Sequence, residues 1–545
     1  MFIDGDHAIF SSKRFLVVDD FQGMRTMFRE MLKSCGAKEI DVATNGKEAI
    51  ALLEVNKYDV VLCDYNLGAG KNGQQVMEEA KVRNLIGLAT AWIVVSAEKT
   101  TEMVLGAMEY MPDDYIIKPF TEAIIRSRLL AAISRKELLH DVEKAIYEKD
   151  YASAITLCDE KLKSGIGHAG DLIRMKAGLL ITAGRRKQAK ELVEKVLAQR
   201  DVPWAKVDLA KVHYLEGELD LARDLLLQVT EVNRTYMGAY DLLAKIFEEK
   251  GDLEEAQSVL VCSIDLSPNS ATRQKALGDI AQKLGDLDLA EKAFRKTIAL
   301  TEHSVLKVPS AYIGLAKICT EKNNPSEAMR VLGEVQKTFD CTQSTIHAKV
   351  IEGTLYRKNR DMKAAQQIAK EVVGLVKGAA SALPAGVALE AAEFIMGNGD
   401  AATAAELLKA VVLNNHENEV VLEQVRAVFK RADMEEDGEE LVTASLREVV
   451  DCNNQAVHLA QAGKLEEAVA MLRDARKMMP GNKRILLNLS YALILLMQRN
   501  GSRELAMDRE VRDYLEQVRK LDPSNEQCGK YRNALDAIPI ARAAA

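Results

Sequence analysis

The sequence predicts an α/β domain with a parallel sheet at the amino terminus, followed by a long all-helical repeat array. Two observations predict this architecture. In the first quarter of the chain, apolar runs rich in β-branched residues alternate with helical stretches, as in a parallel sheet covered by helices. Farther along, a short phrase of glycine, an acidic residue, leucine and alanine returns at a fixed interval. We therefore expect domains over residues 1–132 and 133–545.

Five apolar runs are the expected strands of the sheet. They are Phe15–Val18, Ile40–Ala43, Val60–Cys63, Trp92–Val95 and Tyr115–Ile117. Helices are expected between them, and three are marked locally. A turn at Asn45-Gly46 opens an amphipathic helix through Asn56, and two more helices follow over Thr100–Tyr110 and from Thr121 onward.

Charged side chains follow three of these runs where each strand is expected to end. Asp19 and Asp20 follow the first run, Asp64 follows the third, and Lys118 follows the fifth. Because open α/β sheets bind ligands at the carboxyl ends of their strands, these residues should converge. A carboxylate that accepts a phosphoryl group needs a divalent cation to neutralise the crowded oxygens, and therefore further acidic side chains nearby. The pattern predicts an aspartyl-phosphate switch.

On these residues, the segment resembles a response-regulator receiver domain, a flavodoxin-like fold with a five-stranded parallel sheet. The resemblance covers essentially all of residues 13–132. It implies that Asp64 is the phosphoacceptor, a carboxylate nucleophile. It also implies that Asp20 and Asp64 hold Mg²⁺ with the backbone carbonyl of Asn66, while Asp19 acts directly or through water.

The same resemblance assigns three further roles. Lys118 pairs with a phosphate oxygen, Ser96 is the hydroxyl switch residue, and Tyr115 is the aromatic switch residue. Ser96 would move to hydrogen-bond the new phosphate, and Tyr115 would rotate into the vacated space. A surface formed by the helix after Ser96, the last strand and the final helix would then be remodelled.

The loop after Asp64 departs from the receiver pattern, because it is one residue longer and lacks the usual proline. Gly68 and Gly70 should loosen it, which affects phosphoryl lifetime and partner preference. A phosphate-binding loop at Gly68–Lys71 is rejected, because the first glycine is missing and Asn72 replaces the required serine or threonine.

The remaining chain repeats its phrase with a period of 34 residues, as shown by Ala222, Ala256 and Ala290. Weaker copies extend the array, and about nine or ten repeats fit. These copies lie at 149–154, 184–189, 323–328, 359–364, 399–404 and 463–468. Small residues precede several of the alanines by twelve positions, so that two antiparallel helices can approach closely.

The array thus resembles a tetratricopeptide repeat (TPR) solenoid, which implies a groove for a peptide or helix of another protein. Spacing is irregular over Thr301–Pro309, Gly374–Gly386 and Ala432–Asp451, which we read as longer helices or loops. Histidines such as His213, His347 and His458 fall on repeat helices and are interpreted as packing or surface residues.

Composition excludes several classes of protein. The net charge of -8 provides no basic field for nucleic acid, and no apolar stretch is long enough for a spanning helix. The amino terminus has no export signal, so we expect a cytoplasmic protein with no membrane association. The eight cysteines are widely spaced and read as small hydrophobes rather than metal ligands.

The leading functional prediction is a two-component response regulator whose output is protein interaction. Its partners would be a sensor histidine kinase or phosphotransfer domain and a protein bound by the TPR groove, and a homodimer is left open. The alternative is a constitutive scaffold whose receiver is a docking module independent of phosphate. An output enzyme is disfavoured, and phosphoryl acceptance and hydrolysis by the receiver would be the only chemistry.

The junction between the domains lacks glycine and proline from Phe120 to Ser164. We therefore expect the receiver's last helix to pack on, or run nearly directly into, the first repeat. His140 lies in this helix, and a phosphorelay role for it is disfavoured because the flanking signals of a kinase are missing.

Overall fold

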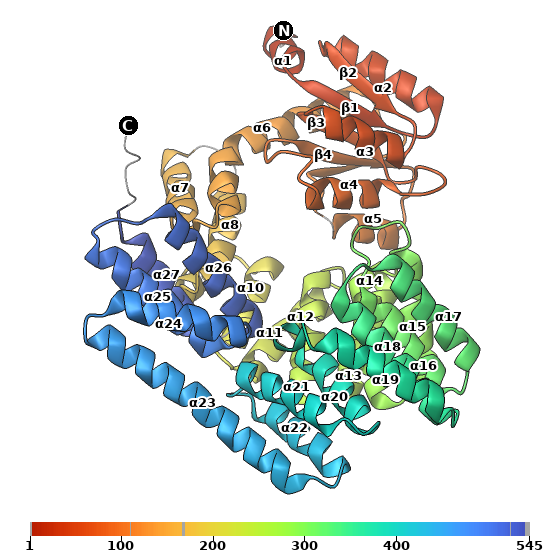
Figure 1. Ribbon diagram of the computed structural model, residues 1–545. Helices are drawn as coiled ribbons and strands as arrows, with labels where there is room; N and C mark the ends of the chain where they lie inside the picture. The colour runs from red at the N-terminus through yellow and green to blue at the C-terminus, as the bar shows by residue number, and fades with distance from the viewer. Residues whose placement is uncertain (1–2, 110, 166–168, 524, 540–545) are drawn as a thin grey trace. The chain divides into compact units, whose positions relative to one another are not determined.

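The computed structural model describes residues 3–109, 111–165, 169–523 and 525–539 (Figure 1). The chain divides into two compact units by its internal contacts. The first unit contains residues 1–182, 186–214 and 218–311, and the second contains residues 183–185, 215–217 and 312–545.

The first unit begins with a five-stranded parallel sheet. Its strands are β1 (Arg14–Val18), β2 (Glu39–Ala43), β3 (Val60–Asp64), β4 (Ala91–Ser96) and β5 (Asp114–Ile117). They lie in the order β2-β1-β3-β4-β5, and all neighbouring pairs are parallel. All five predicted strands are confirmed.

Helices connect these strands and extend the domain at both ends. They are α1 (Ile3–Ser11), α2 (Gln22–Ser34), α3 (Gly46–Val55), α4 (Gly73–Val82), α5 (Thr101–Met108) and α6 (Glu122–Tyr147). The three locally marked helices correspond to α3, α5 and α6, although Tyr110, the expected end of the second, lies outside the described residues. The amino-terminal helix α1 was not predicted.

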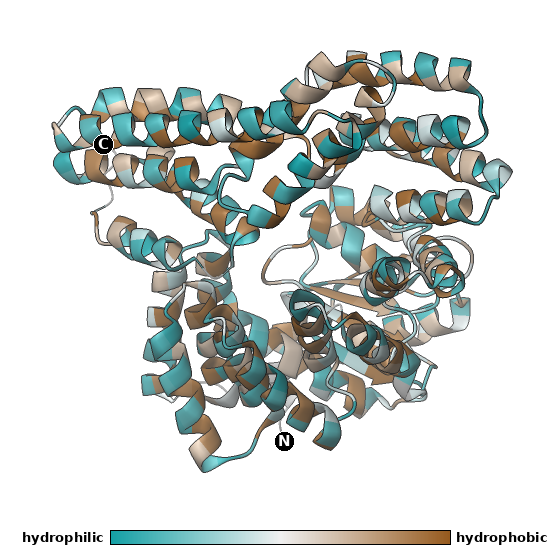
Figure 2. Cartoon of the chain, turned by 90° about the horizontal axis from the view of Figure 1, so that it is seen from below, coloured by the Kyte–Doolittle hydropathy of each residue, from teal (hydrophilic) through white to brown (hydrophobic). Residues whose placement is uncertain are grey.

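Alternation along β1 directs side chains into two separate cores. Phe15 and Val17 are buried with α2 and α6 on one face of the sheet, whereas Leu16 and Val18 are buried with α3 and α4 on the other. Coloured by hydropathy, the helices show hydrophobic and hydrophilic segments alternating along their length (Figure 2). Because both faces of the sheet are buried, the sequences of the strands are continuous apolar runs.

The helix α6 joins the sheet domain to the repeats without a break. Thr121 caps its start by accepting a hydrogen bond from the Ile124 N–H, and the helix then continues for 26 residues. It packs against the sheet through Ile125 and Leu129, and its last turns precede the first repeat helix α7. The expected direct run into the repeats is therefore observed. The boundary between residues 132 and 133 falls inside this helix and stays a prediction.

The other described residues of the first unit are mainly helical. Its elements are α7 (Tyr151–Ser164), α8 (Ala169–Thr182), α9 (Arg186–Gln199), α10 (Pro203–Leu215), α11 (Leu219–Val232), α12 (Met237–Lys250), α13 (Leu253–Leu266), α14 (Ala271–Leu284) and α15 (Leu287–Leu300).

The second unit is helical over its described residues, and the first three residues of its helix α16 belong to the first unit. Its elements are α16 (Pro309–Glu321), α17 (Pro325–Thr338), α18 (Thr342–Lys358), α19 (Met362–Val376), the 3-10 helix η1 (Ala380–Ala382), α20 (Ala385–Met396), α21 (Ala401–Asn414), α22 (Glu419–Arg431), α23 (Glu435–Gln461), α24 (Leu465–Met478), α25 (Lys483–Arg499), α26 (Leu505–Leu521) and α27 (Glu526–Asp536).

The repeated phrase marks helix junctions. Gly251 and Gly285 end α12 and α14 in the left-handed conformation, with φ of 84° and 77°, which a side chain would disfavour. The alanines that follow are fully buried, as in Ala256 and Ala290. At Gly278, an added Cβ would lie 2.8 Å from the Phe294 ring, so the small residue lets the two helices approach.

The three irregular stretches have different structures. Residues 301–308 form a loop between α15 and α16, and residues 377–384 form a connection that contains η1. The third stretch belongs to α23 from Glu435 onward, a single helix of 27 residues, and residues 432–434 form the turn before it. Among the described helices, none has the length and apolarity needed to cross a bilayer.

Candidate functional site

The carboxyl ends of four neighbouring strands bring the predicted site residues together. Asp19 and Asp20 follow β1, Asp64 ends β3, Ser96 ends β4, and Lys118 follows β5. The Lys118 backbone N–H donates a hydrogen bond to the Ser96 carbonyl at 2.8 Å, which extends the strand pairing to the site. Sheet order thus produces the convergence that the sequence predicted.

Lys118 bridges two carboxylates. Its Nζ atom lies 2.9 Å from Oδ2 of Asp19 and 2.6 Å from Oδ2 of Asp64. The Asp19 side chain is nearly inaccessible, and those of Asp64 and Lys118 are only 12% and 16% exposed. Both ion pairs are therefore partly shielded from water, where charge interactions are stronger than on an exposed surface.

The carboxylates are also held by the backbone. Oδ1 of Asp19 accepts a hydrogen bond from the Phe21 N–H at 2.9 Å, and Oδ1 of Asp64 accepts one from the Asn66 N–H at 3.2 Å. Arg25 donates to the Asp19 carbonyl at 2.6 Å. Sequence reasoning missed Arg25, and no motif around it indicated this contact.

Burial raises the pKa of Asp64, while the hydrogen bond and charge of Lys118 oppose that rise and the charge of Asp19 adds to it. For Lys118, burial alone would lower the pKa, but its hydrogen bonds and charge interactions with Asp64 and Asp19 raise it. The lysine is therefore held as a cation. Because Asp64 is buried beside another carboxylate, further positive charge would stabilise its ionised form.

The donor set fits a hard divalent cation. Asp19, Asp20 and Asp64 each offer a carboxylate oxygen, and these three atoms lie within 4.8 Å of one another. Asp20 is exposed, so the cluster is open to solvent on one side. Carboxylates combined with water are the ligands that Mg²⁺ prefers. The carbonyl of Asn66 as a fourth ligand stays a prediction.

The two expected switch residues both contact Glu98 in the loop after β4. The buried Ser96 Oγ accepts a hydrogen bond from the Glu98 N–H at 3.1 Å, and the Tyr115 hydroxyl donates to the Glu98 carbonyl at 3.3 Å. Tyr115 is half-buried, and this burial raises its pKa. Their roles as switches stay predictions.

The loop after Asp64 is pinned at its far end. Gly68 and Gly70 have φ of 76° and 100°, in the left-handed region that favours glycine, and the expected looseness of the loop stays a prediction. Asn72 and Gln75 form a capping box at the start of α4. Lys71, from the rejected phosphate-loop motif, is paired with Glu79 of α4.

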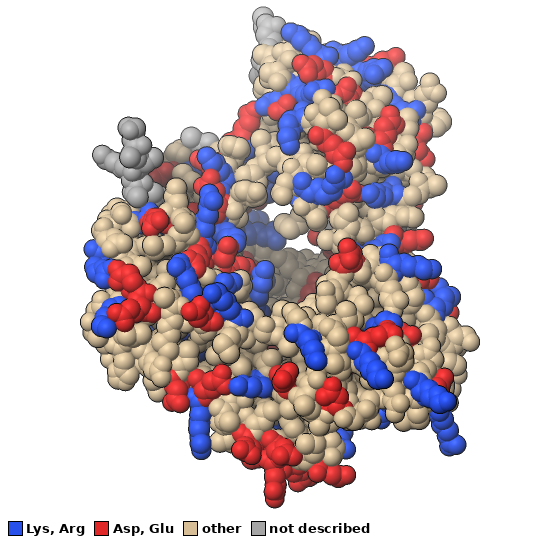
Figure 3. Space-filling view, viewed as in Figure 1, with Lys and Arg blue, Asp and Glu red and all other residues tan. Residues whose placement is uncertain are grey.

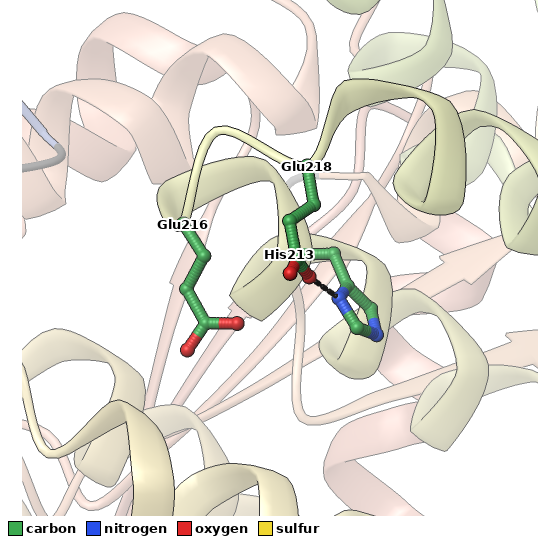
Figure 4. Close-up of side chains that lie close together, drawn as sticks. All are labelled: His213, Glu216 and Glu218. Carbon is green, nitrogen blue, oxygen red and sulfur yellow. Dashed lines mark hydrogen bonds and ion pairs between the residues drawn. The ribbon is translucent and has the colours of Figure 1, made fainter.

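A second cluster of possible metal ligands lies between α10 and α11. His213, Glu216 and Glu218 each offer a ligand atom within 4.8 Å (Figure 4). His213 Nδ1 is hydrogen-bonded to Glu218, and its side chain is mostly buried whereas both glutamates are exposed. This pairing accounts for His213, and exposed glutamates alone do not define a metal site.

Charges of both signs are interspersed on the face shown in Figure 3, without a continuous basic stripe. A stripe of that kind is the usual footprint of a nucleic-acid surface.

Comparisons with known proteins give matches in both parts of the chain. Residues 15–130 match the family model of the response regulator receiver domain, and residues 180–246, 276–303 and 452–474 match tetratricopeptide repeat models. Chemotaxis protein CheY-3 of Vibrio cholerae is 27% identical over 116 residues, which cover 21% of this chain and 88% of that protein. Chemotaxis protein CheY of Pseudomonas aeruginosa is 23% identical over 116 residues, covering 21% of this chain and 92% of that protein.

Solved structures are also similar to part of the chain. The receiver domain of the Francisella response regulator 1452 is 27% identical, with a TM-score of 0.21, and the match covers 23% of this chain and 98% of that one. Vibrio cholerae chemotaxis protein CheY4 is 21% identical, with a TM-score of 0.20 and coverage of 22% and 98%. Residues 15–130 are a response regulator receiver domain, and tetratricopeptide repeats follow it along the chain.

Proposed function

We propose that the protein is a response regulator phosphorylated on Asp64 whose repeats bind a signalling partner in a phosphorylation-dependent manner. The observation that carries this proposal is the Lys118 ammonium, which lies 2.6 Å from Asp64 beside two more carboxylates. That arrangement supplies a nucleophile, a cation for the transferred group and ligands for a metal.

The donor would be a phosphohistidine of a sensor kinase or phosphotransfer domain. A carboxylate oxygen of Asp64 attacks phosphorus, the P–N bond to the donor histidine breaks, and an acyl phosphate remains on Asp64. Lys118 neutralises one phosphoryl oxygen, and Asp19 and Asp20 would hold Mg²⁺ with Asp64 and Asn66. The bound ion would neutralise the other oxygens crowded around phosphorus. Hydrolysis of the acyl phosphate restores the carboxylate.

The test uses the full chain with acetyl phosphate and Mg²⁺. We expect a mass increase of one phosphoryl group in the parent protein and in Asp114→Asn, a control at the opposite end of β5, but not in Asp64→Ala. Modification of Asp64→Ala, or no modification of the parent, would remove the switch. A pull-down from native extract with and without beryllofluoride, a phosphoryl mimic, then tests whether partner binding follows phosphorylation.

A second candidate function is a constitutive adaptor. It is favoured by a cavity that is lined by no receiver residue, so that a partner could bind there independently of Asp64. The cavity occupies about 560 Å³ in the second unit and is lined by residues of α16, α18 and α20, including Lys317, Arg357 and Phe394. Equal capture of a partner by the parent, Asp64→Ala and Asp64→Glu forms would favour this adaptor over the switch.

A further inference from the structure

Within the first unit, the receiver touches the repeats at a second place, far along the chain from α6. Two elements of the receiver make this contact, namely α4 and the end of α5. On the repeat side, the contacts come from the α13–α14 junction and from the α15–α16 junction. The receiver thus holds both ends of the repeat segment that runs from α6 to α15.

The first contact joins α4 to the α15–α16 junction. Ser304 Oγ donates a hydrogen bond to Oε2 of Glu78 at 2.7 Å, and Gln75 Nε2 donates to the Leu300 carbonyl at 3.2 Å. Glu78 and Ser304 are only 6% and 8% exposed. A buried carboxylate that lost its partner would be unfavourable, so this contact is either fully formed or opened to water.

The second contact joins the end of α5 to the α13–α14 junction. Glu109 accepts a hydrogen bond from Ser267 Oγ at 2.8 Å and pairs with the guanidinium of Arg273. Arg273 is 3% exposed and also lies 3.3 Å from Asp241. A charge-assisted contact at such a buried arginine fixes the register between the two surfaces.

A chain of hydrogen bonds leads from the site to the first contact. Tyr65, which directly follows Asp64, donates through its hydroxyl to Gln74 at 3.5 Å. Gln74 donates to Oε1 of Glu78 at 3.1 Å, and Glu78 in turn accepts from Ser304. The start of α4 is also tied to β3, because the Gly73 N–H donates to the Tyr65 carbonyl at 2.9 Å. Movement at the end of β3 therefore reaches the repeats through α4.

The interface is incompletely packed. A cavity of about 490 Å³ lies between the loop after Asp64 and the two repeat junctions, lined by Tyr65 and Gln74 on one side and by Thr272, Thr301 and Ser304 on the other. Missing van der Waals contact weakens the attraction between the two surfaces. The contact therefore depends on its few polar pairs and can be broken by a small shift of α4.

We propose that the α13–α14 and α15–α16 junctions form an intramolecular docking surface for the unphosphorylated receiver, and that phosphorylation of Asp64 releases it through Tyr65, Gln74 and Glu78. The proposal rests on the proposed function, because it requires Asp64 to accept the phosphoryl group. The added group enlarges Asp64 and brings negative charge beside a helix whose docking residue is itself a carboxylate. Release frees the repeats between α6 and α15 from their second attachment.

A disulfide trap tests this docking directly. An added Cβ at Gly106 of α5 would lie 4.0 Å from the Cβ of Asn269, a separation that suits a disulfide. The double variant Gly106→Cys/Asn269→Cys is made in the full chain with the exposed Cys262 and Cys341 changed to serine. We expect rapid oxidation in the unmodified protein and oxidation slower by about fivefold or more with beryllofluoride and Mg²⁺, the low end of ordinary coupling.

The trap is repeated with Asp64→Ala, whose oxidation rate should not respond to beryllofluoride. Hydrogen exchange of the parent sequence gives a second readout that needs no cysteines, and residues 297–306 should exchange faster after modification. The proposal is overturned if the unmodified pair does not oxidise and these residues show no protection, or if modification is complete and both readouts stay unchanged. If acetyl phosphate fails to modify Asp64, the proposed function fails separately, and the trap still reports the unmodified contact.

Discussion

Gly73 lies against the backbone carbonyl of Asp64, so closely that an added Cβ would be 2.0 Å from that oxygen. A Cβ there would have to push apart the start of α4 and the end of β3, because the other atom is backbone and cannot rotate away. The absence of a side chain at Gly73 therefore allows α4 to begin directly beside Asp64.

We predict that Gly73→Ala lowers the unfolding free energy of the receiver by about 1–3 kcal/mol, the usual cost of overpacking. Urea unfolding followed through the buried Trp92, with Trp204→Phe to remove the other tryptophan, measures this change. Gly87→Ala is the matched control, since its nearest neighbour is Thr90 Oγ1 at an ordinary 3.8 Å. Equal stability of the two variants would contradict the prediction.

Replacing the bridging lysine should slow phosphorylation without unfolding the domain. Lys118→Met removes the cation that would meet the transferred group, and loss of one such stabilising group costs about a hundredfold in rate. The initial rate of modification by acetyl phosphate checks this, with Lys99→Ala as a control on an exposed lysine at the same end of the sheet. A rate within twofold of the parent, roughly 0.4 kcal/mol, would show that Lys118 plays no part.

Metal dependence follows from the three carboxylates. We expect chelation of divalent cations to abolish modification, and Asp19→Asn to weaken Mg²⁺ binding because one anionic oxygen near the ion is lost. Calorimetric titration of Mg²⁺ into the parent and the variant measures the affinity. Asp59→Asn is a control for charge alone, since Asp59 lies at the opposite end of β3. Unchanged affinity in Asp19→Asn would rule out its contribution.

In the second unit, Glu390 should make stability depend on pH. Burial alone would raise the pKa of Glu390, but hydrogen bonds and charges from His347 and Lys317 lower it to about 2. Because the folded pKa lies below its ordinary value of 4.5, the stabilisation is fully present above pH 4.5 and is lost as pH falls toward 2.

The matched variant is Glu390→Gln. We expect it to destabilise the second unit by about 1 kcal/mol at pH 7, a discounted value because the Glu390 side chain is 39% exposed. Hydrogen exchange in peptides from α18 and α20 should show this difference at pH 6 and a smaller one near pH 3. A difference that grew toward low pH would contradict the assigned sign.

The sequence predicted the sheet and the convergence of the acidic residues because both depend on local patterns. Each strand is an apolar run with its charged residue directly after it, and parallel pairing then brings Asp19, Asp64 and Lys118 to one edge. The repeat period similarly located junctions such as Gly251 and Gly285. These features follow from patterns local to each strand or each repeat.

The contacts between receiver and repeats could not be predicted in this way. Glu78 and Ser304 are separated by 226 residues, and neither belongs to a motif. Serine and glutamate are residue types that are common on protein surfaces, so their identity did not indicate a contact. Whether the two side chains meet depends on how the repeats between them stack on one another. The long α23 was likewise undetermined, because its degenerate repeat was compatible with a loop or a helix.

The unbroken α6 makes the receiver and the first repeat mechanically continuous. At about 1.5 Å per residue, its 26 residues form a rod of roughly 39 Å with one end against the sheet. A small tilt of α6 at the sheet would therefore displace its other end by a larger distance, because no flexible loop separates the two ends. Limited proteolysis should consequently find no preferred cleavage point within this rod.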